Sequence, residues 1–191
     1  MRQWIRCQAF WSDFQKSEKD DNRSDNSILK VFLGSEIDDK ENWRLLMILH
    51  QGNKSIEFTI ANYQYPEKRP SKEGFDYDAN WLMCEVKYSD AKTNETYKDA
   101  CLLTNELADM VEELSGILDG SEDGYISDFM EPYLKVAAAR ADEKIVIIFQ
   151  FVYDTTEGIW RYRKITTSLS KEETTQIIQV LRELMRKYQV R

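Results

Sequence analysis

The chain has 191 residues, a formal net charge of −8 and 42% hydrophobic residues, which is the composition of one folded domain with or without an appendage. Its three cysteines, Cys7, Cys84 and Cys101, are too few for a disulfide framework and favour a reducing, cytoplasmic setting. The first 14 residues lack the apolar run of a signal peptide, and no stretch has 18 consecutive apolar residues, so we expect neither secretion nor a membrane span.

The first part of the chain is divided by a polar stretch. Residues 1–14 are rich in aromatic side chains, whereas residues 16–27 contain no apolar residue. We therefore interpret residues 1–27 as an N-terminal appendage with a polar linker, and residues 28–191 as a single domain.

Strands dominate the region that follows. We expect strands at 28–33 and 43–51, and a half-buried strand at 54–65, where Ile56, Phe58 and Ile60 alternate with Glu57 and Thr59. A polar loop extends from residue 65 to residue 78. Two further strands are expected at 81–88 and 96–103.

A helix is predicted to begin at Thr104, which we expect to be its N-cap, and to end at Gly120. Apolar residues recur along it at spacings of three and four: Leu107, Met110, Val111, Leu114, Ile117 and Leu118. The acids of this helix fall outside the apolar arc, and we expect them to face solvent: Glu106, Asp109, Glu112 and Glu113.

The second half repeats the order of strands followed by a helix. Strands are expected at 133–139, 145–153 and 160–169, and the near-continuous apolar composition of the middle one indicates an interior strand. Ser170 and Glu173 form a capping-box motif that predicts a final amphipathic helix. The fold class is therefore α+β, with a mostly antiparallel sheet of about seven to eight strands and two amphipathic helices, and the order is compatible with two similar β-β-β-α halves.

Charge is distributed very unevenly along the chain. Residues 99–134 contain ten acids and neither lysine nor arginine. Such a surface repels phosphate and attracts basic proteins, so we expect a basic protein partner and no nucleic acid. The candidate partner-binding residues are Glu106, Asp109, Glu112, Glu113, Asp119, Glu122 and Asp123.

Motifs for enzyme chemistry are lacking, since the chain has a single histidine, His50, and no glycine-rich phosphate loop or nucleophile motif. We therefore expect no enzyme, metal or cofactor. One alternative stays open, a ligand- or calcium-binding module or an enzyme that uses only carboxylates. Residues 119–130 match several positions of a calcium loop, but Met130 stands where a bidentate Glu is needed. Another is a weak homodimer in place of a monomer, in which the acidic stretch of one copy meets the basic C-terminal helix of the other.

An ordered set of short motifs resembles the WapI-type immunity proteins. These motifs occupy residues 63–66, 77–82, 100–107, 131–134 and 168–170, and the similarity covers roughly 46–188. The resemblance implies a bacterial protein of contact-dependent inhibition that binds and neutralises the C-terminal domain of a polymorphic toxin, a nuclease by our interpretation. It implies no catalytic residues. The acidic stretch agrees with it, because a toxin that binds nucleic acid presents a basic surface.

Overall fold

The computed structural model describes residues 45–70 and 74–191. In this part of the chain it contains two four-stranded antiparallel sheets and three α-helices, which confirms the α+β class and the upper estimate of eight strands. The expected appendage at 1–27, the boundary that follows it and the strand expected at 28–33 lie outside the described residues.

The first sheet has the strand order of the sequence: β1 (Met47–Gln51), β2 (Lys54–Tyr63), β3 (Trp81–Ser89) and β4 (Asn94–Leu103). In β2 the predicted alternation holds for Ile56, Phe58 and Ile60, which are buried. Thr59, expected on the solvent face, is buried as well, and its hydroxyl donates to the carbonyl of Leu45 (2.6 Å). The sequence predicted a loop before β3, but a four-residue helix, α2 (Tyr77–Asn80), occupies its end.

The second sheet is built in the same way from β5 (Gly124–Ile126), β6 (Leu134–Ala141), β7 (Lys144–Asp154) and β8 (Arg161–Leu169). β7 pairs with β6 on one side and β8 on the other, so its predicted interior position is confirmed. The turn between β6 and β7 has two residues, and Asp142 adopts a left-handed φ of 54° there, which Asp tolerates better than most residues. A short 3-10 helix, η1 (Thr156–Gly158), lies in the turn before β8.

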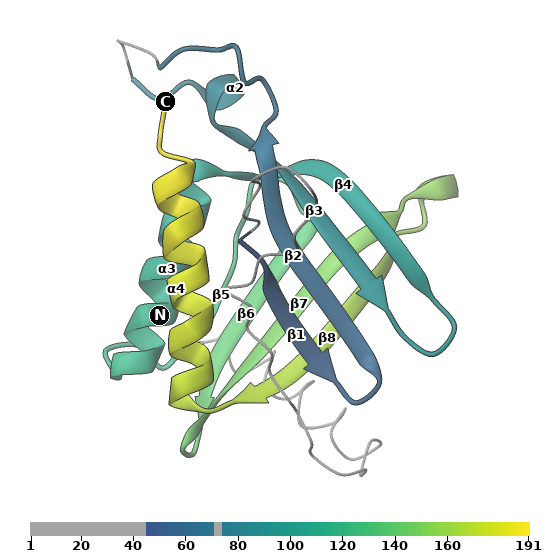
Figure 1. Cartoon of the computed structure of the whole chain (residues 1–191), viewed down its shortest axis with the longest axis vertical. Coiled ribbons are helices and arrows are strands. Elements are labelled where there is room, and N and C mark those ends of the chain that lie inside the picture. The colour runs from purple at the N-terminus through teal and green to yellow at the C-terminus, as the bar shows by residue number, and fades with distance from the viewer. Residues whose placement is uncertain (1–44, 71–73) are drawn as a thin grey trace, which may run out of the picture.

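The core lies between the two sheets and under two long helices, α3 (Thr104–Asp119) and α4 (Lys171–Lys187). Phe58 of β2 and Phe149 of β7 meet across the sheets with ring centroids 5.5 Å apart. Figure 1 shows one sheet in front of the other, with α3 and α4 side by side along one edge of both. The apolar stripes of both helices complete a single hydrophobic core.

The two helices begin differently. Ser170 caps α4 as predicted: its hydroxyl accepts from the Glu173 N–H (3.2 Å), and the Glu173 carboxylate accepts from the Ser170 N–H (2.8 Å). The prediction for α3 was wrong by one residue, because Leu103 is the N-cap and Thr104 is the first helical residue. The Thr104 hydroxyl instead donates to the Asn80 side chain (2.8 Å).

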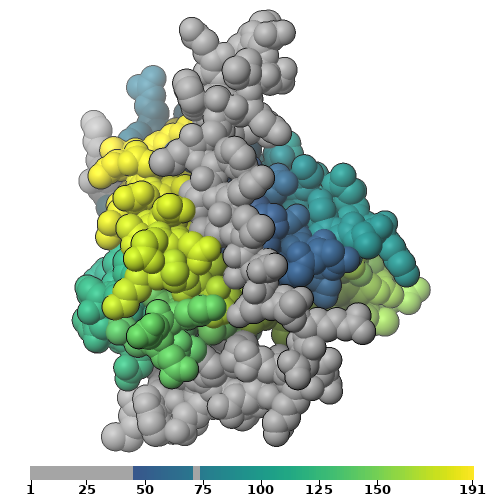
Figure 2. Space-filling model, turned by 60° about the horizontal axis from the view of Figure 1, so that its bottom comes forward, coloured from purple at the N-terminus to yellow at the C-terminus, as the bar shows by residue number. Residues whose placement is uncertain are grey.

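The described part of the chain contains two similar halves, each with four strands followed by a long helix, where three strands were expected. The strand that the sequence did not reveal in the second half is β5, which lies inside the stretch 119–130 that was compared with a calcium loop. Figure 2 shows α4 in yellow and the β1–β2 hairpin in blue, on opposite sides of one face. None of the helices in the described part of the chain has the length and apolar character needed to cross a lipid bilayer.

Candidate functional site

Most of the acids singled out in the sequence lie on one exposed region, formed by the outer face of α3 and the loop that follows it. The inner face of α3 is buried through Leu107, Met110, Val111, Leu114 and Ile117. This packing turns the acids between those positions outward. We call the region the acidic surface, and its residues are Asp109, Glu112, Glu113, Asp119, Glu122 and Asp123.

Glu106 does not belong to this surface, and the prediction that it faces solvent was wrong. Its side chain is buried, with one oxygen accepting from the Leu103 N–H (2.8 Å) and the other from the Met130 N–H (2.5 Å). Burial raises the pKa of this carboxyl, against the lowering effect of the two N–H donors. Glu106 therefore joins the start of α3 to the connection between β5 and β6.

The acids of α3 and its loop are brought together by a reversal of the chain after α3. The Glu122 N–H donates to the Gly116 carbonyl (3.1 Å), and a Cβ on Gly116 would lie only 2.9 Å from the Glu122 side chain. Glu122 thus folds back over the helix toward Glu113. Partial burial raises the pKa of Glu113, and the nearby charges of Glu122, Glu112 and Asp109 raise it further.

A tyrosine that the sequence did not indicate lies beneath the acidic surface. Tyr125 of β5 is buried, and desolvation together with the charges of Glu113, Asp109 and Glu106 raises the pKa of its hydroxyl. It belongs to the hydrophobic core, so the acids of α3 lie over a region of low polarity. Their mutual repulsion is screened less there than in open water.

One basic residue, Arg140 of β6, approaches the end of the acidic surface from outside the acidic stretch. Its guanidinium donates to the Ile117 carbonyl and lies over Gly120, where it complements the negative end of the α3 dipole. Among the described residues, no basic side chain forms an ion pair with any of the six acids. The sequence could not reveal Arg140, because the sheet brings it there from a distant position.

Residues 119–130 do not have the helix–loop–helix geometry of a calcium loop. Within residues 119–130, Gly124–Ile126 forms β5 and pairs with β6, and the next element is a strand and not a helix. The Asp119 carboxylate accepts from the Ser121 N–H (2.9 Å), which lowers its pKa. In the described ranges, no three His, Cys, Asp or Glu side chains are grouped so that they could hold a metal ion.

Two of the short sequence motifs, 77–82 and 100–107, meet at Asn80, which is fully buried at the end of α2. Its amide donates to the carbonyls of Asp76 and Arg191, and its oxygen accepts from the Thr104 hydroxyl and the Arg191 N–H, all at 2.8 Å. In the stretch 77–82, Asn80 therefore has a structural role.

Comparison with known protein families matches residues 47–189 to the Immunity protein WapI-like family. The chain belongs to this family. The matched region runs from the first residue of β1 to just beyond α4 and includes both sheets and both long helices. No curated protein and no solved structure matches the chain.

The family assignment confirms the resemblance found in the sequence, and it implies a toxin as the partner in general terms. The matched region includes the entire acidic surface. It also includes the buried junction of Asn80 and Thr104, so the family's motifs coincide here with contacts that fix the fold.

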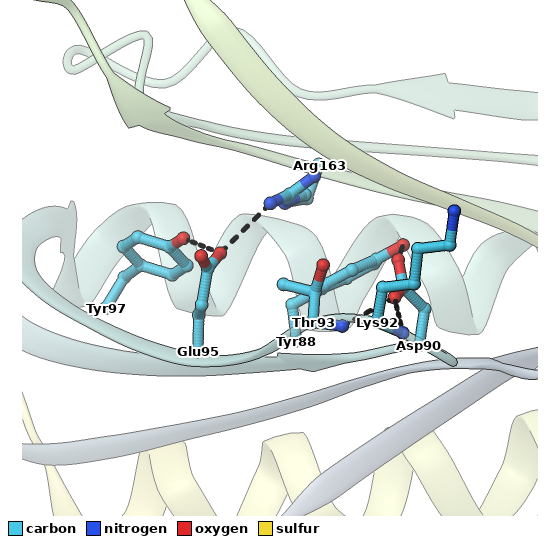
Figure 3. Close-up of polar contacts among 7 residues, drawn as sticks. All are labelled: Tyr88, Asp90, Lys92, Thr93, Glu95, Tyr97 and Arg163. Carbon is cyan, nitrogen blue, oxygen red and sulfur yellow. Dashed lines mark hydrogen bonds and ion pairs between the residues drawn. The ribbon is translucent and has the colours of Figure 1, made fainter.

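A polar cluster between the two sheets was not expected from the sequence. Figure 3 shows the Arg163 guanidinium and the Tyr97 hydroxyl converging on the carboxylate of Glu95, with Arg163 donating at 3.0 Å. The guanidinium carbon also lies 4.9 Å from the ring centroid of Tyr88 and 4.4 Å from that of Tyr153. The cluster joins β4 to β8 and gives this immunity-family fold an ionic link between its sheets.

Residues 161–164 contain three basic side chains, Arg161, Arg163 and Lys164, and two of them have partners within the chain. Arg161 pairs with Asp154 and Arg163 pairs with Glu95, so two of these three charges are compensated within the chain. The C-terminal helix likewise uses Arg182 within the chain, as a donor to the Ser115 hydroxyl of α3 (3.0 Å). On the acidic surface, by contrast, none of the six acids forms an ion pair with a basic side chain of the described chain, although the charge of Arg140 contributes to the lowered pKa of Asp119.

Proposed function

We propose that this protein is an immunity protein that binds the C-terminal domain of a cognate toxin through its acidic surface and neutralises it without any chemistry of its own. Membership of the WapI-like family supports a toxin partner. The acidic surface supports the basic character of that partner, and a nuclease fits, because an enzyme that binds phosphate backbones carries a basic cleft.

The observation that carries the proposal is the lack of compensation on the acidic surface. Its six acids form no ion pair with a described basic side chain, and the charges of Glu122, Glu112 and Asp109 add to the effect of burial in raising the pKa of Glu113. Each like-charge contact on a helix costs a few tenths of a kcal/mol, on the order of 0.3. A basic partner removes this cost on binding and is attracted over a distance of about one Debye length, roughly 8–10 Å.

The proposed function also implies the compartment in which the protein acts. An immunity protein that protects its own cell has to meet the toxin in the cytoplasm, where thiols stay reduced. Both described cysteines, Cys84 and Cys101, are free and buried, which agrees with that compartment. Inhibition by covering a basic cleft needs a monomer with an accessible α3, and this is the state we propose.

The test is a binding and protection experiment with the toxin C-terminal domain encoded beside this chain in its genome. Glu112→Lys combined with Glu113→Lys should slow association by about tenfold or more and flatten its salt dependence. The matched control is Glu67→Lys combined with Glu143→Lys, which changes the net charge equally at exposed acids elsewhere. An unchanged association rate in the α3 variant, with the wild type binding, would exclude this helix as the interface.

Toxin activity provides the second readout. Addition of the wild-type protein should abolish the toxin's activity at a one-to-one ratio, and the α3 variant should need a clear molar excess. If the wild type neither binds nor inhibits the toxin, the proposed function is wrong.

A further inference from the structure

The outer face of the second sheet carries a row of apolar side chains near the β7–β8 turn. Tyr133, Val152 and Tyr162 form this row, since the Val152 N–H donates to the Tyr133 carbonyl (2.7 Å) and Val152 lies opposite Tyr162. The Trp160 ring stacks on Tyr133, with centroids 5.6 Å apart. Tyr162, Trp160 and the neighbouring Ile159 are 55%, 48% and 53% exposed. We call these five residues the aromatic patch, and exposed apolar groups of this kind often mark interaction sites.

Two lysines lie on one side of the aromatic patch. Lys135 and Lys164 are both opposite Gln150, one on each neighbouring strand, so the three residues form the next row of the same face. Side chains two residues apart on a strand share a face and are separated by about 7 Å. Both lysines are exposed, and neither forms an ion pair with an acid of the described residues. We call Lys135 and Lys164 the basic row.

Acids prevail on the other side of the aromatic patch. Asp154 follows the patch residue of β7 by two positions, Glu157 is exposed in the turn after it, and Glu131 precedes the patch residue before β6 by two positions. Arg161 lies among these acids and pairs with Asp154. We call Glu131, Asp154 and Glu157 the acidic end. The charge therefore changes sign along the strands, from the basic row across the aromatic patch to the acidic end.

This order of charges favours one kind of partner. A uniformly basic partner is repelled by the basic row, and a uniformly acidic partner or a nucleic acid is repelled by the acidic end. A surface that fits has an apolar centre and the two signs of charge in the reverse order. A second copy of the chain has this order when it is rotated by half a turn about an axis that crosses the strands within the aromatic patch.

In such a pair, the aromatic patches of the two copies pack against each other, and each basic row lies opposite the acidic end of the other copy. The strands of the two contacting sheets stay nearly aligned, which is a common arrangement of packed sheets. The β7–β8 turn lies on the far side of the molecule from α3 (Figure 1). Each copy therefore keeps the accessible α3 that the proposed function needs.

We propose that the aromatic patch is the contact of a two-fold symmetric homodimer, in which a second copy of the chain covers the patch. This inference goes beyond the proposed function and does not depend on it, because the unit that covers one toxin domain is still a single copy. The contact extends over only three strands, so we expect it to bury less than about 600 Å² of each copy and to be reversible. The aromatic side chains supply most of its affinity, and the charged rows fix its orientation.

Sedimentation equilibrium of the full-length chain over a series of concentrations tests the inference. The wild type should show a reversible equilibrium between monomer and dimer, and the dimer should weaken as salt is added, because part of the contact is ionic. Trp160→Ala combined with Tyr162→Ala should weaken the dimer by a factor of about ten or more. The matched control, Phe75→Ala combined with Tyr77→Ala, removes two exposed aromatic side chains elsewhere and should leave the dimer unchanged.

Two charge variants test the order of charges directly. The first, Lys135→Glu combined with Lys164→Glu, makes both sides of the aromatic patch acidic. The second, Glu131→Lys combined with Glu157→Lys, makes both sides basic. Each variant alone should dimerise less than the wild type, because like charges then meet at both ends of the contact. An equimolar mixture of the two should form a mixed dimer, because every acidic side then meets a basic one.

A wild type that stays monomeric at every concentration would contradict the inference, and so would a dimer that the variant of Trp160 and Tyr162 retains. Failure of the two charge variants to form a mixed dimer would exclude the arrangement with reversed charges. Thermal melts check that each variant is folded, and if the aromatic variant is unstable, the charge variants decide the question alone. Toxin binding measured on the same samples keeps the two proposals apart, since a monomeric variant that still binds the toxin leaves the proposed function standing.

Discussion

Asn80 and Arg191 are joined by two reciprocal hydrogen bonds, from the Asn80 amide to the Arg191 carbonyl and from the Arg191 N–H to the Asn80 oxygen, both 2.8 Å long. The Arg191 guanidinium carbon also lies 3.4 Å from the centroid of the Tyr63 ring. These contacts attach the segment after α4 to the first sheet, so residues more than a hundred positions apart stabilise the same corner of the fold.

The first prediction concerns this junction. Asn80→Ala removes four hydrogen bonds and leaves buried groups without partners, including the Thr104 hydroxyl, so it should lower the free energy of unfolding by about 2–4 kcal/mol. Urea unfolding followed by circular dichroism measures the change. Asn105→Ala, at an exposed position of α3, is the control and should change stability by no more than about 0.5 kcal/mol. Equal stability of the two variants would contradict the structural role of Asn80.

The second prediction concerns repulsion on the acidic surface. Because the pKa of Glu113 is raised in the folded protein, the native state holds this proton to a higher pH than the unfolded chain does. Its contribution to stability is therefore fully present below about pH 4, the unfolded pKa, and is lost as the pH rises through the folded pKa. Glu113→Gln should thus stabilise the protein at pH 7 by a few tenths of a kcal/mol, and the gain should vanish near pH 4.

Urea unfolding at pH 4, 5.5 and 7 measures this difference, with Glu143→Gln in the β6–β7 turn as the control. The control should show no such dependence on pH. A Glu113→Gln variant that is less stable than the wild type at pH 7 would show that the acids do not repel one another.

The third prediction concerns the link between the sheets. Arg163 lies between the rings of Tyr88 and Tyr153 and pairs with Glu95, a geometry that needs a planar guanidinium. Arg163→Lys keeps the charge but loses the stacking, and should lower the free energy of unfolding by about 1 kcal/mol. Arg186→Lys on the exposed face of α4 is the matched control and should have almost no effect. Thermal melts of the two variants compare them directly, and equal melting temperatures would contradict the stacking argument.

The fourth prediction concerns the two buried thiols. A hydrogen bond with Cys101 and burial raise the pKa of the Cys84 thiol well above its usual value, so the reactive thiolate is scarce near neutral pH. In a Cys7→Ser background, iodoacetamide should leave the native protein unlabelled at pH 7.5 and label both thiols in urea. Intact-mass spectrometry gives the count. Labelling of the native protein within minutes would show that β3 and β4 open readily.

The elements whose signals are local were predicted correctly. The capping box of Ser170 and Glu173, three residues apart, correctly predicts the start of α4. The apolar run of β7 correctly predicts an interior strand. Both signals can be recognised without knowledge of distant contacts. The sequence did not predict α2 and β5, because elements of four and three residues are too short to show a hydrophobic periodicity. Contacts with the rest of the fold stabilise them.

In the candidate site, too, local sequence patterns predicted some residues correctly and failed for those whose position depends on distant contacts. A helical wheel places Asp109 and Glu112 correctly, because they need only lie away from the apolar stripe. It fails for Glu106, whose burial depends on the backbone of Met130, 24 residues away. Arg140 and the stacking of Tyr133 on Trp160 also arise from pairing between strands, which no local pattern contains.

The separation of the two faces of α3 has a consequence for how new partner preferences can arise. The inner face carries the packing of the core, whereas the outer acids form no ion pair with a basic side chain in the described part of the chain. Substitutions at Asp109 or Glu112 therefore change what the surface attracts while the core stays intact. Under the proposed function, changes to this one helix would alter the preference for a toxin, while the second helix and both sheets would keep their structure.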